Sequence, residues 1–255
     1  MTMPRISIVI PAYKAEKTIG QTLESLKNQT FTQWEALVIN DCSPDGTQPL
    51  LEKAAAEDER IRVYVNEKNS GVSFSRNRGI AMARGEWIAF LDSDDYWTPD
   101  KLEKQMALAE KYPDCGLFYT GSAFVDEEGN LFDYTLAVPE CIDYRELKKQ
   151  NVVSCSSVLV RREWMMRYPM ENDGIHEDFA VWLRILRDGK VARGVDEPLL
   201  VYRLSANSKS GNKKKAALMT WKTYRFVGLS VVDAAWNMCF YVVRSLRKYR
   251  SIRSK

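Results

Sequence analysis

Four short apolar runs alternate with amphipathic segments in the first half of the chain, and this order constrains the fold more than any other feature. The runs are residues 6–10, 36–39, 61–65 and 87–91. Between the first two, Ile19, Leu23 and Leu26 have the spacing of one helix face. A βαβαβαβ order predicts parallel strands with right-handed crossovers, and therefore an α/β fold with a doubly wound sheet.

The alternation loosens after residue 115, where the sequence predicts a mixed second half. We expect a hairpin, two helices and a strand there, at residues 126–130, 144–150, 178–187 and 157–160. We therefore divide a domain of residues 1–210 into a nucleotide-binding half, residues 1–110, and a substrate half, residues 111–210. C-terminal helices are expected in residues 211–255.

Composition and charge exclude several classes of protein. With 255 residues, 45% of them hydrophobic, the chain can bury a sizeable core, and a net charge of +3 does not suit a polyanion binder. From residue 209 onward, however, twelve Lys and Arg stand against the single acid Asp233, which favours an anionic partner surface, either membrane or nucleic acid. The five cysteines form no CxxC pair and residues 1–13 lack a signal-peptide pattern, so we expect a reduced, cytosolic setting without a zinc site.

Polar clusters directly follow three of the predicted strands. They are Pro11–Tyr13, Asn40–Asp41 and Asp92–Asp95. Ligands of open α/β sheets bind outside the carboxyl ends of the strands. We therefore expect the three clusters to line one crevice.

Three carboxylates lie within four residues in the segment FLDSDD, residues 90–95, where like charges repel one another. The segment follows an apolar strand whose end should be partly buried, so we prefer a Mg²⁺ or Mn²⁺ site to a solvated turn. A calcium-loop, a GxGxxG and a P-loop motif are all missing. Binding of a phosphate group would therefore require the metal and basic residues such as Arg76 and Arg78. The alternative role of these two arginines is surface solubility.

A second acidic pair, Glu177 and Asp178, stands at the predicted start of a helix. A carboxylate is favourable in the first turn of a helix, so capping alone could explain Asp178. The only histidine of the chain, His176, is a candidate ligand or base, although a solvated loop histidine is the commoner case.

Five segments in one order make the chain resemble glycosyltransferase family 2, the inverting enzymes of the GT-A fold that use nucleotide-diphospho-sugars. The segments, between Ile6 and Ser210, are SIVIPAYKAEKTI, QTFTQWEALVINDCSPDGT, NSGVSFSRNRGIAMARGEWIAFLDSDDYW, HEDFAVWLRI and LLVYRLSANSKS. The resemblance implies that residues 1–110 bind the nucleotide sugar and that residues 111–210 bind the acceptor.

The resemblance also implies roles by position. The residues implied to bind the nucleotide sugar are Pro11, Tyr13, Asp41, Arg76, Asp92, Glu177 and Arg203. Those implied to bind the metal are Asp92, Asp94 and Asp95. The implied catalytic base is Asp178. Two positions depart from the family pattern. Lys14 stands where relatives often have asparagine, and Leu204 and Ser205 stand where many have a histidine. Arg203, Ser205 or Lys209 would have to replace that histidine.

The function that the resemblance implies is transfer of a hexose from a UDP-sugar, with Mn²⁺ or Mg²⁺, to a polyprenyl-diphosphate-linked saccharide. The product would be a β-linked unit of an O-antigen (lipopolysaccharide), capsule or related polymer, made at the anionic cytoplasmic face of the inner membrane, with no nucleic-acid partner. Two alternatives stay open. One is a haloacid-dehalogenase-type phosphatase, whose DxDx[TV] motif Tyr96 does not match, and the other is a non-catalytic sugar-nucleotide or membrane-binding module.

The sparsely charged run from Phe226 to Val243 invites a membrane-spanning interpretation. Ser230 and Asp233 form a capping-box pattern, which predicts that a new helix begins there and interrupts the run. The remaining apolar stretch would cover only about 20 Å of a hydrocarbon core about 30 Å thick. We therefore predict a helix that lies in an anionic membrane surface, with Asp233 and Asn237 on a narrow polar stripe; the alternative is packing on the catalytic domain.

Overall fold

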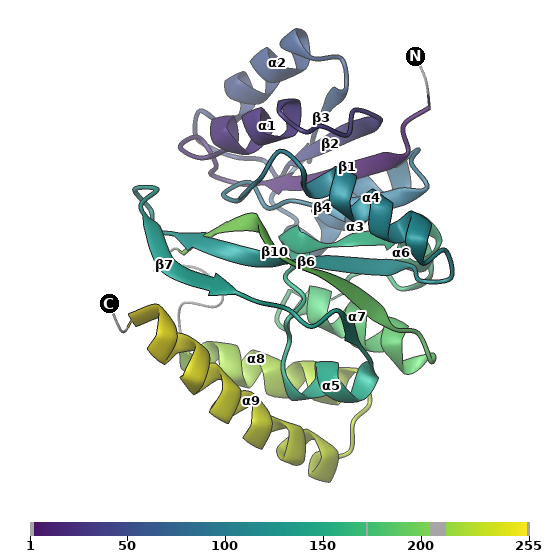
Figure 1. Cartoon of the computed structure of the whole chain (residues 1–255). Coiled ribbons are helices and arrows are strands. Elements are labelled where there is room, and N and C mark those ends of the chain that lie inside the picture. Colours follow the sequence, from purple (N-terminus) through teal and green to yellow (C-terminus); the bar gives the residue numbers. More distant parts are fainter. Residues whose placement is uncertain (1–2, 172, 205–212, 254–255) are drawn as a thin grey trace.

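The four predicted strands are present and form a group of parallel strands at the top of Figure 1. They are β1 (Ile6–Ala12), β2 (Trp34–Asn40), β3 (Ile61–Val65) and β4 (Trp87–Phe90), with helices α1 (Ile19–Lys27), α2 (Thr47–Glu57) and α3 (Val72–Met82) between them. This computed structural model describes residues 3–171, 173–204 and 213–253, and for residues 213 and 245–253 the backbone alone.

The second half of the chain mixes short helices with strands of both directions. Its elements are β5 (Tyr96–Trp97), α4 (Lys101–Lys111), β6 (Leu117–Val125), β7 (Leu131–Leu136), β8 (Cys141–Ile142), α5 (Tyr144–Lys149), β9 (Leu159–Arg161), α6 (Arg162–Arg167), α7 (Glu177–Arg187) and β10 (Ala192–Arg203). The predicted hairpin is confirmed, since β6 and β7 pair in antiparallel fashion across a turn in which Gly129 has a φ of 92°.

Within the described residues the strands form one ten-stranded sheet in the order β3-β2-β1-β4-β9-β6-β10-β5, with β7 on β6 and β8 on β10. Strand β1 lies between β2 and β4 and is parallel to both. The strand order therefore reverses at β1, and such a switch point opens a crevice at the carboxyl ends of the strands. The predicted doubly wound α/β fold is confirmed.

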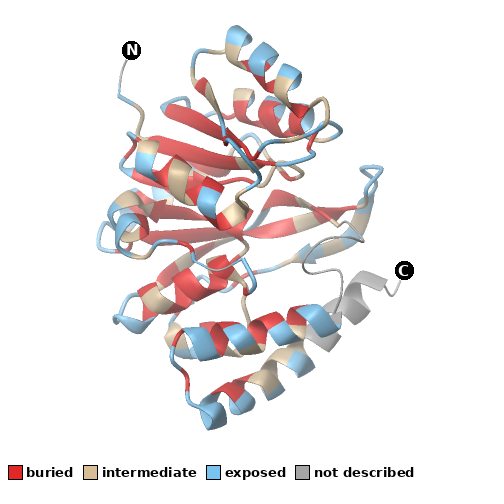
Figure 2. Cartoon of the chain, turned by 180° about the vertical axis from the view of Figure 1, so that it is seen from behind, coloured by how far each residue is buried: buried red, intermediate tan, exposed pale blue. Residues whose placement is uncertain are grey.

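Both faces of β1, β2 and β4 are buried, as the red strands of Figure 2 show. In β1, Ile8 and Ile10 join the hydrophobic cluster that contains residues of α1, α2 and α4, whereas Val9 joins the cluster of α3 and α7 on the other face. Side chains alternate between the two faces of a strand, so a continuous apolar run fits this position.

Glu35 is a buried acid near the amino end of β2, the end opposite the crevice, and no local sequence pattern indicates its role. Its carboxylate accepts hydrogen bonds from the Ser7 hydroxyl at 2.8 Å, the Arg84 Nε at 2.9 Å and the Arg62 guanidinium at 2.9 Å. Burial alone would raise the pKa of Glu35, but the hydrogen bonds, those from Arg84 foremost, outweigh it and lower the pKa.

We expect Glu35→Gln to lower the free energy of unfolding by about 2 to 4 kcal/mol at neutral pH, because two arginines lose their charged partner. A lowered folded-state pKa gives stability that is present above the unfolded pKa and is lost as the pH falls through the folded one. Urea denaturation of the wild type should therefore show a stability loss below about pH 4.5 that is smaller in the variant. The control is Glu86→Gln, at an exposed ion pair; equal effects at both positions would contradict the prediction.

Two helices, α8 (Lys213–Phe226) and α9 (Val231–Arg253), follow the sheet and lie together with α5 at the bottom of Figure 1. The predicted capping box is confirmed: the Ser230 hydroxyl bonds the Asp233 carboxylate at 2.8 Å, and the Asp233 amide donates to the Ser230 Oγ at 3.0 Å. Among the helices of the described ranges, none combines the length and hydropathy needed to cross a membrane. The predicted polar stripe is wrong, because Asn237 is buried while Asp233 is exposed.

Candidate active site

One pocket of about 670 Å³ lies at the carboxyl ends of β1, β2 and β4 and is also bounded by residues of α7, α8 and α9. The predicted site residues that line it are Pro11, Tyr13, Asp41, Arg76, Asp92, Asp94, Glu177 and Asp178. The three predicted polar clusters therefore contribute to one crevice, as expected for this edge of a doubly wound sheet.

Asp41 fixes the loop between β3 and α3. Its Oδ1 accepts hydrogen bonds from the Asn66 side-chain amide at 2.6 Å and from the Ser70 backbone amide at 2.9 Å, and its Oδ2 accepts one from the Gly71 amide at 2.8 Å. Gly71 has a φ of 90°, a conformation that glycine adopts without strain. The loop is thereby held at the wall of the pocket.

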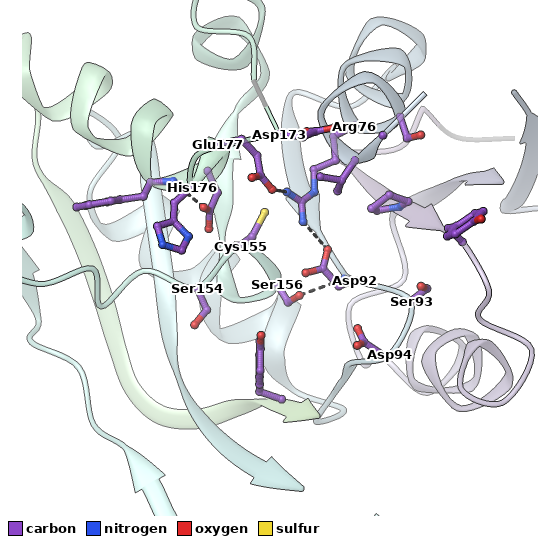
Figure 3. A pocket seen from close by; sticks show the side chains of 18 of the residues that line it. Arg76, Asp92, Ser93, Asp94, Ser154, Cys155, Ser156, Asp173, His176 and Glu177 are labelled. Atoms are coloured by element: carbon purple, nitrogen blue, oxygen red, sulfur yellow. Dashed lines mark hydrogen bonds and ion pairs between the residues drawn. The ribbon is translucent and has the colours of Figure 1, made fainter. Parts of the chain in front are cut away.

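Arg76 joins two acids that are far apart in the sequence (Figure 3). Its guanidinium lies 2.5 Å from the Asp92 Oδ1 and 2.9 Å from the Glu177 Oε1, and its side chain is almost fully buried. Burial alone would lower the pKa of Arg76, but the charges of Asp92 and, less strongly, Glu177 raise it well above its usual value. The Arg76 guanidinium, which is always charged, therefore connects the end of β4 to the start of α7 through two ion pairs.

The FLDSDD segment is fixed to α1 through its backbone. The Thr22 hydroxyl donates to the Ser93 and Asp95 carbonyls at 3.0 and 2.8 Å. Burial, followed by the charge of Asp92, raises the pKa of Asp94 to about 6. Asp95 does not line the pocket; its Oδ1 accepts the Arg203 amide at 3.0 Å, and burial with the charge of Asp94 raises its pKa well above the usual value.

Helix α7 begins at the predicted acidic pair. The Asp178 Oδ1 accepts the Phe179 amide at 2.7 Å, and burial, followed by the charge of Glu177, raises the pKa of Asp178. His176 stands at the N-cap, where its backbone amide donates to the Thr223 hydroxyl at 3.1 Å and its ring Nε2 lies 3.2 Å from the Ala216 carbonyl. His176 therefore connects the start of α7 to α8.

Arg203 lies outside the pocket lining, unlike the other predicted nucleotide-sugar residues. Its guanidinium donates to the carbonyls of Asp94 at 3.1 Å and Asp126 at 3.1 Å and to the Gln21 side chain at 2.6 Å. The other two candidates to replace the family's histidine, Ser205 and Lys209, lie outside the described residues.

Several pocket residues were not predicted from the sequence. They include Ser156, whose hydroxyl accepts the Asp92 amide at 3.1 Å, and Asp173, whose Oδ1 accepts the Ser73 amide at 3.0 Å at the start of α3. Neither residue belongs to a motif, and each accepts a hydrogen bond from a backbone amide more than sixty residues away in the sequence. Lys14 has a φ of 54°, a region that asparagine adopts more readily than lysine.

The donor set can be tested for a divalent cation. Within the part of the chain that the structure describes, no three His, Cys, Asp or Glu side chains are grouped to hold a metal by themselves. Asp92 and Asp94 line the pocket, however, and the pKa of Asp94 is raised by burial and, second, by the charge of Asp92, a repulsion that a bound cation would offset. Mg²⁺ and Mn²⁺ accept one or two carboxylates when phosphate oxygens supply further ligands, so these residues fit such an ion with a bound diphosphate.

Comparison with known proteins identifies the family. Residues 7–168 match the profile described as Glycosyl transferase family 2. The chain belongs to glycosyltransferase family 2. TuaG of Bacillus subtilis (strain 168), described as a putative teichuronic acid biosynthesis glycosyltransferase, is 37% identical over 96% of this chain and 97% of its own. The Escherichia coli UDP-Glc:alpha-D-GlcNAc-diphosphoundecaprenol beta-1,3-glucosyltransferase WfaP is 30% identical over 97% of this chain and 96% of its own.

Solved structures agree with the family 2 assignment at the level of the fold. S. aureus TarS 1–349 in complex with UDP-GlcNAc superposes with a TM-score of 0.73 at 19% identity, over 97% of this chain and 74% of that one. The Pyrobaculum calidifontis mannosyltransferase PcManGT, in complex with GDP-Man and Mn²⁺, gives 0.70 at 15% identity, over 94% and 69%. The predicted GT-A fold is confirmed, and membership of family 2 excludes the phosphatase alternative.

Proposed function

We propose that the protein is an inverting hexosyltransferase that moves a hexose from a UDP-sugar to a hydroxyl of a polyprenyl-diphosphate-linked saccharide. One observation carries the proposal: Asp41, Asp92, Asp94 and Asp178 line a single pocket. A nucleotide sugar needs a nucleobase contact, a diphosphate site and a base near the anomeric carbon in one place. The name of TuaG, which mentions teichuronic acid biosynthesis, supports a polysaccharide as the product, and we propose an O-antigen, a capsule or a related polymer. The name of WfaP supports a lipid-linked sugar as the acceptor.

Asp178 is the base in this proposal. It takes the proton of the acceptor hydroxyl while that oxygen attacks the anomeric carbon from the face opposite UDP. The new C–O bond forms as the bond to the UDP oxygen breaks, so one displacement converts an α-linked donor into a β-linked product. The raised pKa of Asp178 suits this role, because a carboxyl group with a higher pKa is a stronger base.

Arg76 positions the two sides of the reaction. Its ion pairs with Asp92 and Glu177 hold the acids of the donor side at a fixed place relative to the helix that carries Asp178. Pro11, Tyr13 and Asp41 are the proposed nucleobase contacts, at the end of the pocket formed by β1 and β2. Small errors in such geometry are costly, because catalysis depends on holding the reacting atoms in line.

Mn²⁺ or Mg²⁺ would be held by Asp92 and Asp94 together with the donor diphosphate. When bound, such an ion supplies Lewis-acid stabilisation of the charge on the departing UDP. Asp95 fixes the segment of residues 90–95 to β10, because its carboxylate accepts a hydrogen bond from the Arg203 backbone amide. The Mn²⁺ in the PcManGT structure supports this choice of cofactor.

The proposed place of action is the cytoplasmic face of the inner membrane, where the enzyme is peripheral. The name of WfaP, an acceptor on diphosphoundecaprenol, supports a membrane-bound substrate. A non-catalytic binding module, the alternative that the sequence left open, would not need a further carboxylate with a raised pKa, Asp178, in the same pocket as the donor acids.

A donor and acceptor screen tests the proposal. We expect release of UDP from UDP-glucose or UDP-galactose only when a lipid-diphosphate-linked N-acetylhexosamine is added, and no turnover of GDP-mannose. The readout is a coupled UDP assay with mass spectrometry of the lipid product. The proposal would be contradicted if GDP-mannose were the only donor used. It would also be contradicted if no nucleotide sugar were used with any lipid-linked acceptor.

A further inference from the structure

Helix α9 presents an apolar side to solvent. Val232, Trp236 and Val243 are 78%, 65% and 50% exposed, and with the exposed Cys239 they follow the i, i+4, i+7, i+11 spacing of one helix face. We call this the outer face of α9, and it consists of Val231, Val232, Trp236, Cys239, Val242 and Val243. Figure 2 shows exposed residues along both C-terminal helices.

The opposite side of α9 is the one that packs on the protein. Ala234 and Asn237 are buried there, and the helix lies against α8, α5 and β7. The Asn237 side chain donates to the Asp233 carbonyl at 2.8 Å, so its polarity is satisfied within the helix. The two buried residues on this side are small or polar, and Met238 is the partly buried hydrophobic residue of α9 that packs on the core. Valine and tryptophan face outward instead, which departs from the usual pattern of a surface helix.

The exposed apolar surface of the molecule is concentrated here. Of the fourteen large hydrophobic side chains that are exposed in the described residues, seven lie between Leu218 and Val243. Scattered exposed apolar residues need no explanation, but a contiguous group indicates a binding surface.

Cations accompany this apolar surface. On α8, Lys214, Lys215, Lys222 and Arg225 are exposed, and α9 adds the partly exposed Arg244, whose guanidinium lies 3.8 Å from the Glu146 carboxylate of α5. The only acid on the two helices is Asp233, which is occupied with Ser230 in the capping box. The sequence beyond residue 244 continues with five Lys or Arg and no acid.

We propose that the outer face of α9 and the cations of α8 form a docking surface for an anionic lipid bilayer. Apolar and aromatic side chains that enter the acyl boundary, with cations at headgroup level, are the combination that binds such a surface. A second copy of the chain fits less well, because pairing through this face would bring two basic helix pairs together.

The same two helices also form a wall of the active-site pocket. Thr220 of α8 and Tyr241 of α9 line it together with Asp178. The docking surface would therefore hold the pocket beside the bilayer, where the sugar of a lipid-linked acceptor can enter while its lipid stays in the membrane. This deepens the proposed function and rests on it for the identity of the acceptor.

Vesicle flotation of the full chain tests the surface. We expect binding to vesicles of phosphatidylcholine with phosphatidylglycerol, weaker binding at high salt, and little binding to pure phosphatidylcholine. The double variant Val232→Asp/Trp236→Asp should lower the partition coefficient by about tenfold or more, because two apolar anchors are replaced by anions. The control Met166→Asp, at an exposed apolar residue of α6, should bind like the wild type.

Two further measurements separate this proposal from the proposed reaction. With an acceptor on a short, soluble lipid, the double variant should keep wild-type turnover, so a loss confined to vesicle-bound acceptor supports docking. Vesicle binding by a protein that transfers no sugar would support the surface while overturning the reaction. Equal flotation of the double variant and the Met166→Asp control would overturn the docking surface. So would a wild-type dimer, detected by light scattering, that does not bind vesicles and that the double substitution converts to a monomer.

Discussion

Asp94→Asn should lower kcat/KM by about 10³-fold or more, because the proposed cation at this position would supply several kcal/mol of leaving-group stabilisation. The amide has nearly the shape of the carboxylate but lacks its charge. Burial and the charge of Asp92 already disfavour the ionised form of Asp94. We therefore expect the variant to be at least as stable to heat as the wild type while it loses activity.

The matched control is Asp100→Asn, at a partly exposed acid that follows the same segment and pairs with Lys104. It should leave turnover within a few-fold of the wild type. EDTA should stop the wild-type enzyme, and added Mn²⁺ or Mg²⁺ should restore it. Full activity in EDTA, or an active Asp94→Asn enzyme, would show that the acids serve another purpose.

Asp178→Asn should lower kcat by about 10²- to 10⁴-fold, the usual contribution of a general base. The substituted side chain can still accept the Phe179 amide at the start of α7, so the helix should keep its first turn. The donor site should be intact, and the affinity for the UDP-sugar, measured by calorimetry, should change by no more than a few-fold.

Asp188→Asn is the control for Asp178, since it changes the same residue type at the other end of α7. Its partners Tyr168 and Arg167 are at the surface, and turnover should be preserved. If Asp178→Asn stays within a few-fold of wild-type turnover, Asp178 only caps the helix and another group must accept the proton.

Much of the fold could be predicted because local patterns agree with the tertiary structure. The apolar runs of β1, β2 and β4 are buried on both faces, so their sequence reports their environment directly. The capping box at Ser230 is a local signal as well, and it marked the start of α9 correctly. The buried role of Glu35 left no such signal, because its partners Ser7, Arg62 and Arg84 come from three other segments.

The positions of site residues could be predicted where those residues directly follow a strand. Contacts between site residues that are brought together by tertiary packing could not be predicted. The strand-end positions of Asp41 and Asp92 follow from topology. The bridge from Arg76 to Asp92 and Glu177 spans 16 and 101 residues of sequence, and no spacing rule reveals it. Periodicity showed that α9 has an apolar side, but only the packed structure shows that this side faces solvent.

The anomeric configuration of the product tests the central claim most directly. The wild-type enzyme should be given an α-linked UDP-hexose and a lipid-diphosphate-linked N-acetylhexosamine, and the glycosidic linkage determined by NMR. Single displacement with Asp178 as base predicts a β-linked disaccharide. An α-linked product, or free hexose without a new linkage, would contradict it.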